Sequence, residues 1–260
     1  MNLTELLHAA RIDGARATFD VGDDWLQGRS VFGGLQAAVG WRAMRTLIAA
    51  DIPLRTLQMT FIAPIEQGEV SASARVLRAG KSATHVEARL HAGDETQAVM
   101  LCVFGSARES MVQRRPAAPA PVEKRVRIPF IAGVTPRFMQ QFDVDLIAGA
   151  GPFSGKPVEK TAFDLSLHDP GPPTEAHLLV IADFVPPVAL SWMPKPVPGS
   201  SLTWMFEVLE PDFARQPLAG WRVESALVGA RDGYTSQTTT VFAPDGTPVA
   251  LSRQSMVVFG

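Results

Sequence analysis

The sequence predicts an α+β protein made of two tandem units, each of which combines a helix with a curved antiparallel sheet. Three observations lead to this fold class. Long segments alternate apolar and polar residues with a period of two and are separated by Gly-Asp turns. A segment with helical periodicity precedes each main group of strands. The order of strands and turns in residues 57–105 returns in residues 201–260, which indicates an internal duplication.

The first unit, residues 1–112, is centred on a helix expected from Gly33 to about Ala50. Apolar residues recur in it at mixed three- and four-residue steps, so much of its circumference should be buried. Asp51 and Pro53 should end it, because proline cannot continue a helix. The other elements expected in this unit are a short helix at residues 3–10 and strands at residues 16–21, 54–65, 68–93 (interrupted at Gly80-Lys81) and 96–107.

Residues 113–127 are rich in Pro, Ala and Arg and predict an extended linker. The second unit, residues 128–260, repeats the plan of the first. Its helix is expected at residues 174–185, with Thr174 as the N-cap after a proline pair. Because the repeat period is far longer than that of a solenoid, the two copies should form a closed pair. Strands are expected at residues 138–149, 158–169, 201–209, 220–246 (interrupted at Gly233) and 247–260.

Composition argues against several classes of function. The formal net charge is −2, so we expect no nucleic-acid partner. No apolar run is long enough to span a bilayer, and residues 1–14 lack the pattern of a signal peptide, so a cytoplasmic protein without a membrane partner is expected. The single cysteine excludes an intramolecular disulfide framework. Metal-ligand spacing, a dinucleotide fingerprint and a serine-hydrolase elbow are all missing, so we expect neither a metal nor a cofactor.

Four segments carry a resemblance to a known family: "RSVFGGLQAAVGWRAM", "FIAPIEQGEVSASARVLRAGKSATHVEARL", "IADFVPPVAL" and "VALSRQSMVV". The first resembles the "FGG" entry to the central helix of the acyl-CoA thioesterase II family. The second resembles a strand pair of that family, and the last two resemble its aspartate and glutamine segments. The resemblance covers nearly the whole chain. It implies a double hotdog fold, in which the two helix-wrapped sheets form one continuous sheet, and a place in fatty acid metabolism.

Enzymes of this family hydrolyse acyl-CoA thioesters with an Asp, a Gln and a Thr or Ser that hold a water near the thioester carbonyl. On this resemblance, Asp183 matches the aspartate and Gln254 matches the glutamine. Burial among apolar residues raises the pKa of a carboxyl, which favours its use as a base only if the rise in pKa stays moderate. A glutamine amide offers a donor and an acceptor without titrating. The alternatives are that Asp183 only caps a turn before Pro186 and that Gln254 faces solvent.

The third position of the family pattern departs from a clean match. Alignment on Phe206 places Gly199 or Ser200 at the family's threonine and Ser201 at the aspartate that follows it. Thr203 lies on the same strand in a shifted register. The resemblance therefore leaves the hydroxyl role open among Ser200, Ser201 and Thr203.

The turn Phe32-Gly33-Gly34 leads directly into the first helix. A helix N-terminus presents unpaired N–H groups and a partial positive charge, and a backbone without Cβ atoms lets another group approach closely. We therefore expect a thioester oxygen, which gains charge in the transition state, to lie against this backbone, with the Gly34 amide polarising the carbonyl. A tight turn that serves only packing is the alternative.

The expected substrate-binding residues are Phe32, Gly33 and Gly34 at this turn, together with Arg78 and Lys81, which could meet CoA phosphates. For each basic residue, a solvated loop charge is the alternative. The expected function is hydrolysis of acyl-CoA to a free acid and CoA by a water that the Asp, the Gln and a hydroxyl activate. The alternative is a non-catalytic acyl-CoA-binding hotdog protein that has lost the full triad. Family likeness also suggests a homo-oligomer.

Overall fold

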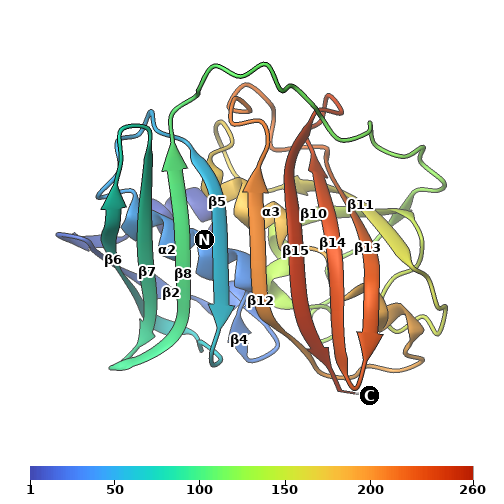
Figure 1. Ribbon diagram of the computed structural model, residues 1–260. Coiled ribbons are helices and arrows are strands. Elements are labelled where there is room, and N and C mark those ends of the chain that lie inside the picture. Colours follow the sequence, from blue (N-terminus) through green and yellow to red (C-terminus); the bar gives the residue numbers. More distant parts are fainter. Residues whose placement is uncertain (260) are drawn as a thin grey trace.

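The structure, a computed structural model, describes residues 1–259. Within these residues, strands pair antiparallel into one sheet of order β1-β2-β6-β7-β8-β5-β12-β15-β14-β13-β11-β10-β9, while β3 and β4 form a separate ribbon (Figure 1). This confirms the predicted α+β class and the continuous sheet. The strands are β1 (Arg11–Asp13), β2 (Arg16–Val21), β3 (Leu26–Gln27), β4 (Ser30–Val31), β5 (Leu54–Phe61), β6 (Gly68–Ala79), β7 (Ala83–Ala92), β8 (Glu95–Gly105), β9 (Val126–Arg127), β10 (Phe142–Ala148), β11 (Lys160–Leu167), β12 (Gly199–Val208), β13 (Trp221–Arg231), β14 (Tyr234–Phe242) and β15 (Pro248–Val258). The helices are α1 (Leu3–His8), α2 (Gly33–Met44) and α3 (Glu175–Ala182), with 3-10 helices η1 (Asp23–Trp25), η2 (Arg137–Gln141) and η3 (Val188–Trp192).

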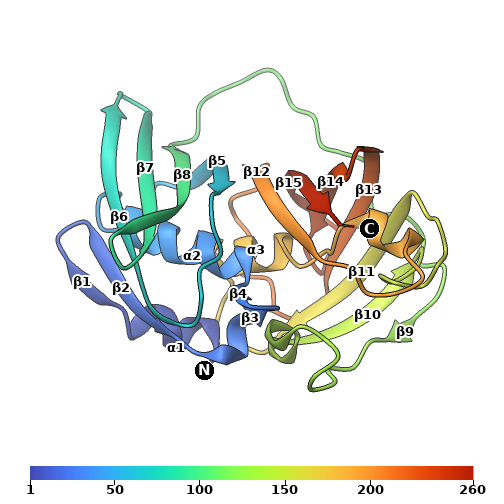
Figure 2. The same cartoon turned by 90° about the horizontal axis from the view of Figure 1, so that it is seen from below.

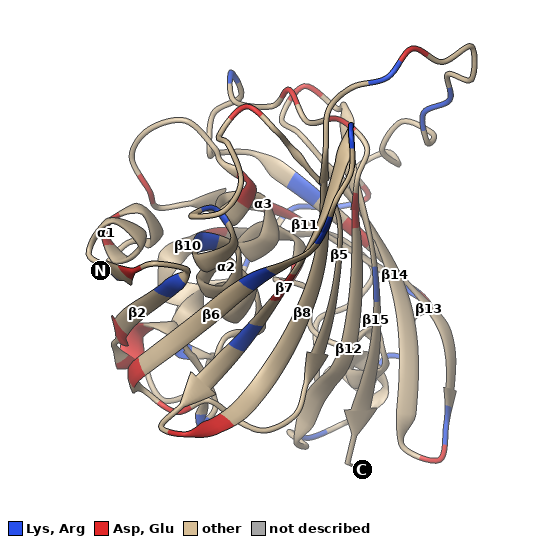
Figure 3. Ribbon diagram, turned by 60° about the vertical axis from the view of Figure 1, so that its left-hand side comes forward, with Lys and Arg blue, Asp and Glu red and all other residues tan. Residues whose placement is uncertain are grey.

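The two halves join in the middle of the sheet, where β5 and β12 pair antiparallel. The second half therefore runs in the opposite direction to the first. Helices α2 and α3 lie side by side on one face of the curved sheet (Figures 2 and 3) and are antiparallel to each other. At one end Gly34 of α2 lies against Val180 of α3, and at the other Arg45, just after α2, pairs with Glu175 at the start of α3 at 2.5 Å. The N-terminus of α2 thus meets the C-terminus of α3.

The core lies between the inner face of the sheet and these helices, and its C-terminal half is unusually polar. Residues Thr235, Gln237 and Thr239 of β14 and Ser252 and Gln254 of β15 are all buried. They occupy alternate positions of their strands, as side chains on one face of a strand must. Gln254 therefore faces the helices and not solvent.

Helix α2 is shorter than expected, because it ends at Met44 and not near Ala50. The guanidinium of Arg45 donates to the backbone carbonyls of Ala49 at 3.0 Å and Ile52 at 2.8 Å. These bonds fold the following segment back against the helix end, so the chain leaves the helix before the proline that was expected to end it.

Other boundaries differ by less. Residues 138–141, expected to begin a strand, belong to η2, and the strand starts at residue 142. The last two residues of the expected linker, Val126–Arg127, add a short strand to the edge of the sheet. None of the helices described in residues 1–259 combines the length and the apolar character needed to cross a membrane.

Candidate active site

Asp183 lies directly after α3, where it is buried against the start of α2. Every residue of α3 after the first is buried, so the end of the helix is held inside the molecule. A carboxylate in such a place needs hydrogen-bond donors. The side chain of Gln254 donates from Nε2 to Asp183 Oδ1, and the backbone N–H of Gly34 also hydrogen-bonds to the carboxylate. Three residues from separate segments therefore meet at one point.

The pKa of Asp183 is far above that of an ordinary aspartate. Burial raises it from 3.8 to about 7, and the hydrogen bonds from Gln254 and Gly34 oppose a further rise. A carboxyl group with a pKa near neutrality is partly ionised at pH 7, and its anion is basic enough to take a proton from an attacking water. The carboxyl group of Asp183 is thus suited to general base catalysis.

The two glycines at the start of α2 are explained by this contact. A Cβ atom on Gly33 would lie 2.7 Å from Asp183 Oδ2, and one on Gly34 would lie 2.9 Å from Val180 Cα. The N-cap residue Phe32 makes no side-chain hydrogen bond to the helix. Instead, the carboxylate of Asp183, at the end of the neighbouring helix, accepts a hydrogen bond from a free backbone N–H group at the start of α2. The Gly34 amide, which sequence reasoning assigned to a thioester oxygen, is used by Asp183.

The variant Gly34→Ala is expected to lower the free energy of unfolding by about 2 kcal/mol, because the new methyl group would press on the backbone of α3. Gly229→Ala is the matched control, since a Cβ atom at Gly229 meets nothing within 4 Å. Urea unfolding of the two variants measures the difference. Equal stability of the two variants would contradict the close packing of the helices.

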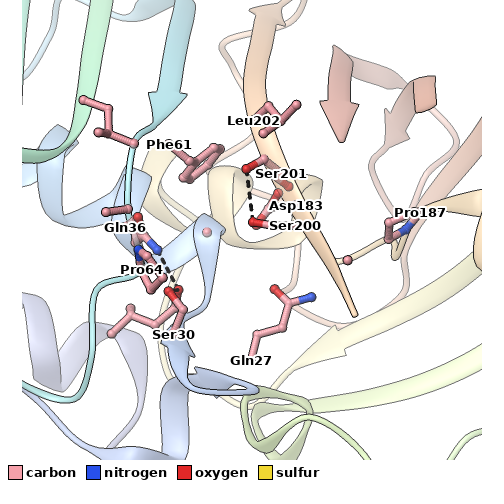
Figure 4. Close-up of a pocket in the computed structure, with 15 residues that line it drawn as sticks. Gln27, Ser30, Gln36, Phe61, Pro64, Asp183, Pro187, Ser200, Ser201 and Leu202 are labelled. Atoms are coloured by element: carbon pink, nitrogen blue, oxygen red, sulfur yellow. Dashed lines mark hydrogen bonds between the residues drawn. The ribbon is translucent and has the colours of Figure 1, made fainter. Parts of the chain in front are cut away.

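A cavity of about 220 Å³ lies in front of Asp183 (Figure 4). Val31, Gln36 and Asp183 in its wall are buried, whereas Gln27 and Ser200 at its rim are exposed. It is therefore open to solvent on one side and closed on the other. Its lining residues are Gln27, Ser30, Val31, Gly33, Gln36, Phe61, Ile62, Ala63, Pro64, Asp183, Pro187, Gly199, Ser200, Ser201 and Leu202.

Gln254 stands behind Asp183 as seen from the cavity, with only 4% of its surface exposed. On β15 it alternates with Arg253 and Ser255, which are exposed. The amide of Gln254 therefore influences groups in the cavity only through its hydrogen bond to the carboxylate of Asp183.

The structure places the three candidate hydroxyl residues in different positions relative to the cavity. Ser200 and Ser201 line the cavity beside Asp183. Thr203 is exposed, while Trp204 next to it is buried, so Thr203 occupies the outer face of β12. A β-bulge between Ser201 and Thr203 shifts the register of the strand at this point. The structure thus brings two of the three hydroxyls to the cavity and leaves Thr203 away from it.

Arg78 and Lys81 are not brought to the cavity. They lie at the turn between β6 and β7, which stands at one end of the sheet, whereas β5 reaches the cavity with Phe61 at the opposite end (Figure 1). Phe32 is fully buried and stacks on Phe138 with ring centroids 4.0 Å apart. It belongs to the core beside the cavity.

Sequence reasoning missed Gln36, which lines the cavity three residues after Gly33. Residues three apart share a helix face, so the spacing was a usable signal. Gln36 Nε2 donates to the backbone oxygen of Val31 at 2.7 Å. Its Oε1 has no hydrogen-bond partner within the part of the chain that the structure describes. The loop residues Gln27 and Ser30 carried no comparable signal.

Comparison with known proteins agrees with the geometry. A family model described as the acyl-CoA thioesterase N-terminal domain matches residues 21–105, and one described as the acyl-CoA thioesterase C-terminal domain matches residues 113–258. A search of curated proteins finds no significant match.

Solved structures of the same fold span the whole chain. A hot dog fold protein of unknown function from Alicyclobacillus acidocaldarius is 24% identical, with a TM-score of 0.85 over 100% of this chain and 99% of its own. An acyl-CoA thioesterase II from Mycobacterium marinum is 15% identical, with a TM-score of 0.76 over 98% of this chain and 97% of its own. A tesB protein of Mycobacterium avium is 13% identical, with a TM-score of 0.78 over 100% of both chains. The double hotdog fold expected from the sequence is confirmed.

Proposed function

This chain belongs to the acyl-CoA thioesterase family whose two domain models it matches, and on that premise we propose that it hydrolyses acyl-CoA thioesters to a free acid and CoA. The observation that carries the proposal is a carboxyl group with a pKa of about 7 in the wall of a cavity that opens to solvent. Such a group can hold and deprotonate a water at neutral pH.

In the proposed reaction, Asp183 takes a proton from a water in the cavity as the water oxygen bonds to the thioester carbonyl carbon. The tetrahedral intermediate then collapses, and the carbon–sulfur bond breaks. The proton held by Asp183 passes to the departing sulfur, so the products are the carboxylic acid and the thiol of CoA. The carboxyl group returns to its starting state, and no other reactant is consumed.

Two kinds of polar group assist Asp183 in this proposal. Gln254 is a positioning residue, because its amide fixes one carboxylate oxygen from behind. The hydroxyl of Ser200 or Ser201, both in the cavity wall, orients the water or the carbonyl oxygen. The hydroxyl role stays open between these two serines.

The second candidate function is acyl-CoA binding without turnover. The residue that favours it is Gly199, which lines the cavity where the family pattern, in one alignment on Phe206, has a hydroxyl residue. In this case the protein would hold acyl-CoA tightly and release no thiol.

The test is thiol release from a panel of short, medium, long and aromatic acyl-CoAs by the purified protein and by Asp183→Ala. We expect turnover of at least one acyl class by the wild type and its loss in the variant. Tight binding with no thiol release in either protein would replace hydrolysis with the binding role. Turnover that survives in Asp183→Ala would keep the reaction and overturn the assignment of the base.

A further inference from the structure

A second cavity, of about 240 Å³, lies between η3 and the β13–β14 hairpin. Two aromatic residues in its wall are open to solvent: Trp192 is 51% exposed and Tyr234 is 61% exposed. The indole N–H of Trp192 donates to the backbone oxygen of Val158 at 3.0 Å. This bond holds the ring in one orientation although half of its surface is uncovered, as suits a surface on which a flat ligand group stacks.

Positive charge gathers around this cavity. Arg231 lines it, with 89% of its side chain exposed, and its nearest acidic neighbour is Asp232 at 3.4 Å. Lys156 and Lys195 are exposed on the adjoining loops. The backbone N–H of Lys156 donates to the oxygen of Ser191 in η3 at 2.8 Å, which fixes that loop beside Trp192. These three cations outnumber two carboxylates, that of Asp232 and that of Glu159, whose backbone oxygen accepts from the N–H of Leu227 in the cavity wall. The excess of positive charge favours an anionic ligand.

The two cavities are neighbours. Gly199 and Pro187 line the first and Val258 lines the second, and Gly199 pairs with Val258 across β12 and β15. A Cβ atom on Gly199 would lie 3.9 Å from both Pro187 and Val258. A single layer of residues therefore separates the two cavities. This layer forms part of the solvent-exposed rim of the first cavity. A substrate whose reacting end enters beside Asp183 would pass over this rim toward Trp192.

We propose that the second cavity binds the nucleotide end of CoA, with the adenine base against Trp192 and Tyr234. Arg231, with the two lysines, then faces the phosphates. This inference rests on the proposed thioester hydrolysis. It gives the phosphate-binding role to the β13–β14 turn, and not to the equivalent β6–β7 turn at the other end of the sheet. Binding energy from this remote group would serve to position the thioester.

The test compares an acyl-CoA with the acyl-pantetheine thioester of the same acyl group, which lacks the nucleotide. We expect the wild type to have a kcat/KM about tenfold or more higher for the acyl-CoA, since stacking of a base on an aromatic ring stabilises the bound substrate. In Trp192→Ala and in Arg231→Glu the ratio of the two values should fall toward one. Because each ratio is taken within one protein preparation, a partly unfolded variant does not distort it.

The control is Arg78→Ala combined with Lys81→Ala at the equivalent turn, which should keep the wild-type ratio. A loss of ratio in the control and not in the cavity variants would overturn the proposal. The proposal would also be overturned if variants at Trp192 changed the acyl-chain preference and left the ratio unchanged, because that result would place the acyl tail in this cavity.

A binding measurement distinguishes failure of the proposed nucleotide site from failure of the proposed hydrolysis. If the wild type hydrolyses neither thioester, calorimetry with adenosine 3′,5′-bisphosphate still tests the cavity. Binding by the wild type that Arg231→Glu weakens about tenfold or more would support the site without the reaction. No binding by the wild type would overturn it.

Discussion

Asp183→Asn is expected to lower kcat/KM for acyl-CoA hydrolysis by about 1,000-fold, within the range found when a general base is removed. Asparagine has nearly the same shape, so the fold should persist, but its amide cannot accept a proton from water. Thiol release across the acyl-CoA panel measures the loss. Asp20→Asn, a change at an exposed carboxyl, is the control and should retain full activity. Equal rates in the two variants would remove Asp183 from the mechanism.

The same substitution is expected to stabilise the protein at neutral and alkaline pH. Burial raises the pKa of Asp183 from 3.8 to about 7, so the folded state holds this proton more tightly than the unfolded state. The wild type therefore loses stability as the pH rises from about 4 to about 7, by about 4 kcal/mol in all. The asparagine side chain of the variant has no proton to lose, so this part of the pH dependence disappears.

Urea unfolding at several pH values checks the expectation. The difference in unfolding free energy between Asp183→Asn and the wild type should be smallest near pH 4 and reach about 4 kcal/mol in favour of the variant at pH 8. A difference that does not change with pH would show that the folded-state pKa of Asp183 is ordinary. A gain in stability joined to a loss of activity is typical of a polar group kept for function.

The sequence patterns that worked were local ones. Strand alternation separated Gln254 from Arg253 and Ser255, and the structure buries the first and exposes the other two. The duplicated order of strands and turns led to the correct fold class, because each copy carried its own turn residues. The glycine pair at the start of α2 correctly marked a close approach, although the group that approaches is Asp183 itself.

The positions that the sequence alone does not decide depend on how distant segments pair. The turn with Arg78 and Lys81 resembles a phosphate-binding turn in residue type alone. Only the antiparallel pairing of β5 with β12 decides which end of the sheet it occupies. In the same way, the bulge between Ser201 and Thr203 appears only once β15 lies beside β12. A register that a neighbouring strand sets cannot be read from one strand alone.

The role given to Gln254 leads to the second large effect, a change in pH dependence. Because Asp183 must be ionised to act as a base, kcat/KM of the wild type should rise with pH to a plateau, with a midpoint near its pKa of about 7. The hydrogen bond from Gln254 lowers that pKa. In Gln254→Leu the midpoint should therefore move to higher pH, and the rate at pH 7 should fall about 100-fold from lost ionisation and lost orientation together.

Gln237→Leu separates this effect from the general cost of losing a buried amide. Gln237 lies directly opposite Gln254 on the neighbouring strand and is equally buried, but its Oε1 accepts from the backbone N–H of Val188 at 2.9 Å. Its removal should lower Tm and leave the midpoint of the pH profile near 7. If Gln254→Leu shows the wild-type midpoint, the glutamine does not act through the ionisation of Asp183. If its rate recovers in part as the pH is raised, the remaining carboxyl group is still the base, and the glutamine sets the pH at which it works.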